Sequence, residues 1–241
     1  KAKAQRGLAA PEQHARRQRL LGALPPTQAV QLRWASGKGA GSWLLPPTEE
    51  DHVLADAHFL PALALRLQLP LPAAANATCL RRREDGTRCG VDLVATPGHC
   101  LGCHVGGGTT QRHDGVRDWL AGWLRARGAT GVDTEQFVPA WDRVRADGTV
   151  EATRLDVAFT DPTAGATYVD VVVTDAALGA GTPAGRRRAV RDGAAAAAAE
   201  ERKHRRYPGR ALTAFALEAL GRAGPEAQAL LRTWARGDAD L

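Results

Sequence analysis

Apolar residues in the second half of the chain change their spacing several times, which predicts a mixture of helices and strands. Leu120 and Leu124 recur at helical spacing. Leu155, Val157 and Phe159 instead alternate with polar or small residues, as in a strand with one buried face. The predicted order is helix 113–127, strands 132–138, 153–160 and 167–174, helix 189–206, strand 211–217 and helix 225–235.

The first third of the chain is rich in Ala, Leu and Pro and carries helix-like apolar spacing in two places. Helices are therefore expected at 12–24 and 49–67, the second ending before Pro70. A linker is expected at 70–76. Together these features predict an N-terminal helical segment that precedes the folded second half.

Composition and charge narrow the class of protein. The 241 residues are 44% hydrophobic and 24% charged, as in globular proteins. No run approaches the roughly 20 apolar residues of a membrane helix, so we expect no membrane partner. The net charge of +6 allows a polyanionic partner such as nucleic acid but does not require one. The chain begins with Lys1 and has no Met, so we expect a piece of a longer protein.

Two aspartates lie on the predicted strands around a turn at Asp161–Gly165. A hairpin centred on Thr163 pairs residues whose numbers sum to 326, which places Asp156 opposite Asp170. Facing carboxylates repel each other and lower stability. A divalent cation such as Mg²⁺ or Mn²⁺ would offset this repulsion. The alternative is that Asp156 pairs with an arginine and Asp170 is solvated.

The following helix is Ala-rich and carries one lysine. Glu200, Lys203 and Tyr207 are spaced three and four apart and share one side. Only four of the 32 basic residues are Lys, and a compact ammonium can do chemistry that Arg cannot. The alternative is a solvated, charged helix end. The segment 186–206 has eight basic and three acidic residues, a net charge of +5 that could hold phosphates.

The four cysteines all lie between residues 79 and 103, together with histidines, which favours a metal site over disulfides. A hairpin at Arg83–Thr87 could bring the first two cysteines together. Cys100 and His104 are alternative ligands, and reduced, packed cysteines without a metal are a further alternative. The expected Zn²⁺ ligands are Cys79, Cys89, His99 and Cys103.

The order of strands, acids and lysine resembles the PD-(D/E)XK restriction-like nucleases. Arg154–Asp156 stands where that family has its Pro-Asp, with Leu155 in place of proline. Asp170–Val172 stands where it has (D/E)XK, with Val172 in the usual lysine position. In several branches of the superfamily the lysine lies on the following helix, an arrangement that Lys203 matches.

Further motifs extend this resemblance to about residues 35–241. Arg112-His113 opens a helix, Glu135 lies in the next segment, and Ala197–Lys203 is followed by Tyr207. With the preceding Cys/His cluster, they resemble the C-terminal end of site-specific non-LTR retrotransposon polyproteins, where a zinc knuckle precedes a restriction-like endonuclease. The resemblance implies a nuclear, Mg²⁺-dependent enzyme that nicks target DNA to prime reverse transcription, with element RNA as a further partner and a reverse transcriptase upstream in the same polypeptide. It also implies these catalytic residues: Asp156, Asp170, Lys203, Glu135 and Tyr207.

The expected fold is α/β, with a nuclease-like core of helix, three-stranded meander, helix and strand. The expected domains are a helical linker region (1–70), a zinc-binding knuckle (71–110) and a restriction-like endonuclease domain (111–241). A nuclease fold that binds nucleic acid without cutting it is the main alternative. A purely structural interaction domain is a third class, and it predicts no salt-dependent DNA affinity.

Overall fold

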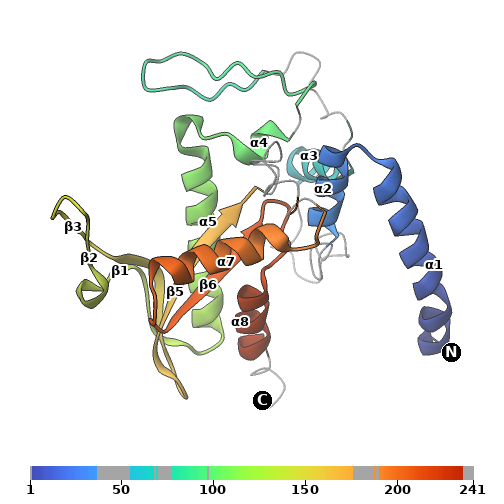
Figure 1. The fold of residues 1–241 in the computed structure, drawn as a ribbon. Helices are drawn as coiled ribbons and strands as arrows, with labels where there is room; N and C mark the ends of the chain where they lie inside the picture. The colour runs from blue at the N-terminus through green and yellow to red at the C-terminus, as the bar shows by residue number, and fades with distance from the viewer. Residues whose placement is uncertain are drawn as a thin grey trace.

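A computed structural model describes residues 2–36, 55–67, 69, 78–96, 98–175, 187 and 190–235. At its centre is a four-stranded sheet in the order β1-β4-β5-β6 (Figure 1). Neighbouring strands are antiparallel except for β5 and β6, which are parallel, so the sheet is mixed. The strands are β1 (Thr130–Phe137), β4 (Arg154–Asp161), β5 (Gly165–Thr174) and β6 (Leu212–Glu218).

Helices cover both faces of this sheet, which makes the fold mixed α/β. On one face, α5 (Gly108–Ala126) and α8 (Pro225–Ala235) pack over the main core cluster, in which Leu120 and Leu230 meet Val157, Val169 and other strand residues. On the other face, α7 (Ala194–Arg206) packs its alanines against β5 and β6 (Figure 1). Because α7 joins the two parallel strands, it is the crossover between them.

The register of the β4–β5 hairpin confirms the pairing predicted from the turn. Val157 lies opposite Val169, and Asp161 lies opposite Gly165, so paired residue numbers sum to 326. Burial along β4 also alternates as predicted, with Leu155, Val157 and Phe159 buried. The sequence pattern therefore correctly predicted which residues share each side of the hairpin.

The predicted meander is interrupted by an additional ribbon that the hydrophobic pattern did not predict. After β1 comes the short helix η4 (Pro139–Trp141), then the paired strands β2 (Arg143–Val144) and β3 (Val150–Glu151). This β2–β3 ribbon projects from the sheet in Figure 1. Its turn requires a glycine, because Gly148 has a φ of +81°.

The N-terminal region contains α1 (Ala2–Ala23), α2 (Pro26–Ala35) and α3 (Asp56–Leu67). The sequence pattern predicted the first and third of these but not α2, whose Val30 and Trp34 pack against Ala195 and Leu220. The start of the helix expected from residue 49 and the linker expected at 70–76 lie outside the described residues. Among the described helices, none has the length and apolar character that crossing a membrane requires.

Candidate functional site

Four polar side chains from four elements meet at one end of the sheet. Asp156 lies on β4 and Asp170 on β5, while His113 comes from the first turns of α5 and Lys203 from the last turn of α7. All four are largely withdrawn from solvent; even His113, the most exposed, keeps only 30% of its side-chain surface. Charged side chains that are this far withdrawn from solvent are stable only when each is paired with an opposite charge or a hydrogen-bonding group.

Lys203 is the partner of Asp170. The Lys203 Nζ atom lies 2.7 Å from Asp170 Oδ1, and the carboxylate is 8% exposed. The crossover places this amine, since α7 packs on the face of β5 that also presents Val172. Of the two sequence-based interpretations, the solvated helix end is wrong for Lys203, because its ammonium points at the acid.

Asp156 is held by two donors and by its acidic neighbour. Its Oδ2 atom accepts a hydrogen bond from the Val171 N–H at 2.6 Å and one from His113 Nε2 at 3.2 Å. It also shares a side-chain hydrogen bond with Asp170. The alternative pairing of Asp156 with an arginine is not found among the described contacts.

The pKa values of the two aspartates shift in opposite directions, although both side chains are buried. Burial raises the pKa of Asp170 to about 6; the Lys203 charge opposes this rise and the neighbouring Asp156 adds to it. Burial also works against ionisation of Asp156, but the hydrogen bonds from His113, Asp170 and Val171 outweigh it and keep its pKa below the ordinary value. The hydrogen bond to Asp156 raises the pKa of His113 to about 9. One acid is thus ionised and the other is poised to hold or lose a proton.

Glu135 lies beside this group but its side chain turns elsewhere. The ladder pairs Thr134 with Val157 and Gln136 with Leu155, so the residue between them lies across from Asp156. Two arginines hold the Glu135 carboxylate, Arg117 at 2.5 Å and Arg154 at 2.7 Å. We find no hydrogen bond or ion pair between Glu135 and either aspartate in the described contacts.

The backbone at Glu135 is unusual, since its φ is +57°, the sole positive φ of a non-glycine residue within the described chain. Such a conformation costs free energy and is frequent at functional sites. A catalytic role for Glu135 stays a prediction. Its ion pairs with Arg117 and Arg154 were not predicted from the sequence.

Tyr207 is buried rather than aligned with Lys203 on the helix surface. It follows the last residue of α7 and its N–H donates to the Lys203 carbonyl at 3.0 Å. Its ring packs with Val138, Leu155 and Leu212. Burial, followed by the charge of Asp170, raises the pKa of the Tyr207 hydroxyl. The residue supports the site by packing, and a catalytic role for it stays a prediction.

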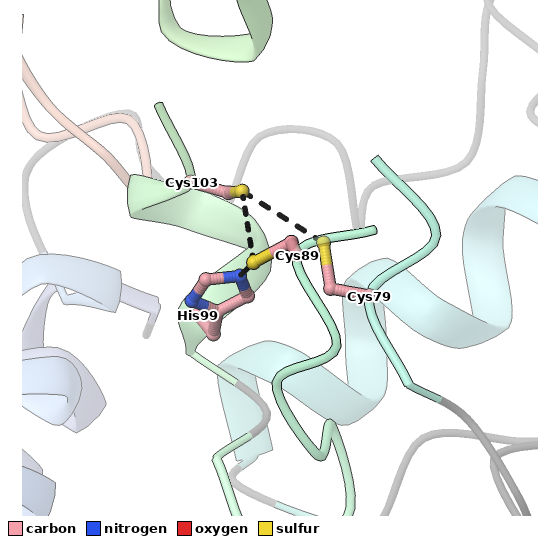
Figure 2. Close-up of side chains that lie close together, drawn as sticks. All are labelled: Cys79, Cys89, His99 and Cys103. Atoms are coloured by element: carbon pink, nitrogen blue, oxygen red, sulfur yellow. Dashed lines mark hydrogen bonds between the residues drawn. The ribbon is translucent and has the colours of Figure 1, made fainter. Parts of the chain in front are cut away.

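The Cys/His cluster forms a second, separate group, shown in Figure 2. The Cys79 and Cys103 sulfurs are 3.7 Å apart, Cys103 and Cys89 are 3.9 Å apart, and His99 Nε2 lies 3.3 Å from Cys89 Sγ. A tetrahedral Zn²⁺ ion with Zn–S bonds of about 2.3 Å separates two sulfur ligands by about 3.8 Å. The donor set and its spacing therefore fit a metal ion such as zinc.

The two halves of this cluster come from different local structures. Cys79 and Cys89 lie on a hairpin whose arms are joined by hydrogen bonds such as Cys89 N–H to the Arg81 carbonyl. His99 opens the short helix α4 (His99–Gly102), and Cys103 follows it. The hairpin predicted around residues 83–87 is thus confirmed.

The alternative ligands lie outside the cluster. All four predicted ligand atoms lie within 4.8 Å of one another, and the group does not include Cys100 or His104. Cys100 is exposed, and the His104 ring lies 3.4 Å from the Thr109 hydroxyl. The predicted ligand set is therefore the one that the fold assembles.

The cluster is joined directly to the helix that carries His113. The chain runs from Cys103 through η3 (Val105–Gly107) into α5. Arg112, next to His113, donates a hydrogen bond to the Leu101 carbonyl on α4. The start of α5 is therefore fixed by the same short segment that presents His99 and Cys103.

Comparisons with known proteins do not add to this description. No protein-family model matches the chain, and neither a curated protein nor a solved structure matches it.

Proposed function

We propose that this chain is a metal-dependent DNA endonuclease with a PD-(D/E)XK fold and a preceding zinc knuckle. The observation that carries the proposal is the convergence of Asp156, Asp170 and Lys203, with the amine 2.7 Å from the second acid. Two buried carboxylates in contact, beside one amine, are costly for stability alone and useful for binding a cation near a phosphate. We extend the proposal to a nick in target DNA that primes reverse transcription of a retroelement.

The architecture is consistent with this assignment. A helix, a meander of β1, β4 and β5, a crossover helix and the parallel strand β6 follow one another in the order expected for such nucleases. The acids lie on the second and third strands of the meander, and the lysine lies on the crossover helix. Val172, in the usual lysine position, packs instead against the alanines of α7.

In the proposed reaction, Asp156 and Asp170 hold a Mg²⁺ or Mn²⁺ ion. When bound, this cation supplies positive charge that polarises the phosphate and promotes ionisation of the attacking water. Lys203 orients the water and stabilises the charge that develops on the phosphate oxygens. The water oxygen bonds to phosphorus and its proton passes to solvent, the bond from phosphorus to the 3′ oxygen breaks, and that oxygen takes up a proton from solvent. The product is a 3′ hydroxyl, which a polymerase can extend.

His113 acts on this site through Asp156. Its Nε2–H donates to Asp156 Oδ2, and the Val171 N–H donates to the same oxygen. The other carboxylate oxygen takes neither of these two bonds, so it would be the one to hold the cation. We assign His113 as a positioning residue, comparable to the outer-sphere partners of metal ligands in other enzymes.

The test is cleavage of supercoiled plasmid DNA by the 241-residue chain with Mg²⁺ or Mn²⁺. We expect nicked circles from the wild type and a loss of at least about 1,000-fold in rate for Asp156→Asn and Asp170→Asn. DNA affinity in Mg²⁺-free buffer should be unchanged in both variants. Asp118→Asn is the matched control, since this acid lies on the outer surface of α5 and pairs with Arg117. Cleavage that survives both active-site substitutions would refute the proposal.

The alternative is a nuclease fold that binds DNA without cutting it. It is favoured by one observation, which is that Val172 stands in the usual lysine position. DNA binding by the wild type without any Mg²⁺- or Mn²⁺-dependent cleavage would establish this alternative.

A further inference from the structure

Two arginines at the C-terminal end of α7 each lie over an aromatic ring. The Arg206 Cζ atom is 5.6 Å from the centre of the Tyr207 ring, and the Arg210 Cζ atom is 5.8 Å from the centre of the Trp141 ring. The two rings contact each other, with centres 5.9 Å apart. These four side chains form one contiguous group, which we call the arginine platform.

A tight turn places Arg210 beside the end of the helix. Pro208 and Gly209 occupy its two central positions, Gly209 has a φ of +68°, and the Arg210 N–H donates to the Tyr207 carbonyl at 3.3 Å. Proline followed by glycine with a positive φ is the pattern of a type II turn. The Arg210 guanidinium also donates to the Ala140 carbonyl at 2.9 Å. The turn and this bond together fix the position of the guanidinium.

The arginine platform lies beside the acid pair and is open to solvent. Arg206 is one helical turn beyond Lys203, whose ammonium contacts Asp170. Burial raises the pKa of the Tyr207 hydroxyl, the charge of Asp170 adds to this rise, and a hydrogen bond from Arg206 opposes it. The phenol therefore connects the arginine platform to the second acid. The Arg206 side chain is 44% exposed, and Arg210 is also exposed.

Positive charge exceeds negative charge in this region. The segment 201–210 has five basic residues and one acid, a net charge of +4. The neighbouring segment 142–151 has two arginines and three acids, so the two segments together carry +3.

The acid nearest to the arginine platform does not neutralise it. The end of α7 lies beside the β2–β3 ribbon in Figure 1, where Glu151 of β3 contacts Arg206. Arg145 shares the same carboxylate at 3.6 Å. Among the described contacts, Arg210 meets a carbonyl oxygen and an aromatic ring, neither of which carries a negative charge. Positive charge therefore remains available to an anion from outside the chain.

Stacked guanidinium groups are well suited to the phosphates of a nucleic-acid strand. A guanidinium presents several N–H donors in one plane, and contact with a ring orients that plane while leaving donors free. Phosphate oxygens accept these donors in pairs. Because Arg206 is one turn, about 5.4 Å, beyond Lys203 along the helix, the arginine platform lies to one side of the phosphate that Lys203 would contact.

We propose that Arg206 and Arg210 bind backbone phosphates of the DNA strand being cut, next to the scissile phosphate. This inference rests on the proposed function, because it assigns a substrate contact of that site. The two arginines hold the strand over the acid pair and take no part in the chemical step.

The first experiment measures binding of the full chain to a fluorescein-labelled duplex in Mg²⁺-free buffer, with zinc retained, over a series of salt concentrations. Arg210→Gln should bind about 5- to 10-fold more weakly at about 0.1 M salt and reduce the dependence of log Kd on log salt by about one unit of slope. Arg205→Gln is the matched control, because it removes the same charge from a 67% exposed position on α7 outside the arginine platform. We expect less than about half of the effect there.

Arg210→Lys separates the charge from the planar group. It keeps a positive charge and a donor for the Ala140 carbonyl, so the salt slope should match that of the wild type. Affinity should still fall about 3-fold, because an ammonium cannot stack on Trp141 and bind a phosphate in a bidentate manner. Wild-type affinity of Arg210→Lys, or a wild-type salt slope in Arg210→Gln, would overturn the assignment.

The second experiment measures the kinetics of plasmid nicking in Mg²⁺. Arg210→Gln should raise KM for DNA about 5- to 10-fold and leave kcat within about 2-fold of wild type, because a phosphate contact away from the breaking bond acts equally in the ground state and the transition state. A loss of kcat at unchanged KM would place Arg210 in the chemical step and contradict the proposed role.

The two proposals fail in different ways. A reduced salt slope in Arg210→Gln but not in Arg205→Gln, with no cleavage by the wild type in Mg²⁺ or Mn²⁺, would support the phosphate contact and refute the nuclease. An unchanged salt slope in Arg210→Gln, with nicking by the wild type, would refute the phosphate contact alone. Absence of both DNA binding and cleavage by the wild type would refute both.

Discussion

The Val171 N–H donates a 2.6 Å hydrogen bond to Asp156 Oδ2, so strand β5 supplies both the second acid and a backbone donor for the first. This bond takes the place of a ladder bond, because the β4–β5 backbone pairing ends at Val157 and Val169. Where the strands separate, the Asp156 carboxylate fills the gap. The geometry of the acid pair is thus determined by backbone as well as by side chains.

The raised pKa of Asp170 predicts a pH-dependent loss of stability in the metal-free site. The folded-state pKa of about 6 lies above the ordinary value for an aspartate, so the folded state keeps a proton that the unfolded chain has released. Stability therefore falls as pH rises from about 4 to 6 and stays lower above pH 6. We expect Asp170→Asn, which cannot ionise, to raise Tm at pH 8 by several degrees and to differ less from wild type at pH 5.

Thermal unfolding in Mg²⁺-free buffer measures this effect. Asp147→Asn is the opposite-sign control, because the Thr149 hydrogen bonds lower the pKa of Asp147 and its ionised form stabilises the fold. A Tm at pH 8 that is lower for Asp170→Asn than for wild type would contradict the predicted cost of ionising this buried carboxyl.

His113 should affect the metal dependence of cleavage more than its maximum rate. Removal of its hydrogen bond in His113→Ala leaves Asp156 less well oriented, and we expect the Mg²⁺ concentration for half-maximal nicking to rise 10- to 100-fold. His113→Asn retains an N–H donor and should recover part of the effect. His14→Ala, an exposed histidine on α1, is the control. A lower maximum rate at unchanged Mg²⁺ dependence would indicate direct contact with the substrate instead.

The knuckle should bind one zinc ion through the four clustered residues. We expect about one equivalent of zinc in the wild type by mass spectrometry of metals, and loss of that zinc in Cys79→Ser, Cys89→Ser and Cys103→Ser. Cys100→Ser should keep its zinc, because Cys100 lies outside the cluster. Loss of zinc from Cys100→Ser would show that the ligand set is different.

Gly224 should be intolerant of any side chain. A Cβ at this position would collide with Glu200 Oε1 and lie 3.3 Å from Ala196 Cβ. Glu200 also accepts hydrogen bonds from the Glu226 N–H at 3.0 Å and the Ala227 N–H at 3.5 Å, at the start of α8. We expect Gly224→Ala to destabilise the fold by about 1–3 kcal/mol, because it disrupts this helix cap.

Replacement of Gly122 by alanine should have the opposite effect on the stability of the fold. This glycine lies within α5, and a Cβ there meets no atom within 4 Å. Gly122→Ala should stabilise the helix by about 0.5–1 kcal/mol. Urea unfolding of both variants gives the comparison, and equal effects at the two positions would argue against the Glu200 contact.

Local pattern was enough to predict the β4–β5 hairpin and the four residues of the Cys/His cluster. The turn at Asp161 sets the register of β4 and β5 by counting, and the strand period then decides which residues share a face. The knuckle hairpin was likewise indicated by Asp85-Gly86-Thr87. The β2–β3 ribbon carries the same signal in Asp147-Gly148-Thr149, and this match could have predicted it.

Contacts between distant parts of the chain could not be predicted in this way. The direction of Lys203 depends on how α7 lies across β5 and β6, which no local pattern specifies. The packing of α2 against Leu220 is equally remote in sequence. The left-handed backbone at Glu135 has no sequence signal, and the two arginines that hold its side chain come from α5 and β4, which are remote in sequence.

The crossover between β5 and β6 also sets the sequence of events during folding. Asp156 and Asp170 belong to one hairpin and can approach as soon as it closes, whereas Lys203 arrives only when the later strand docks in parallel. Until that moment the closed hairpin carries unbalanced negative charge and is penalised for it. Arrival of the ammonium relieves this penalty, so we expect the cluster of Asp156, Asp170 and Lys203 and the parallel strand pair to form in one cooperative event.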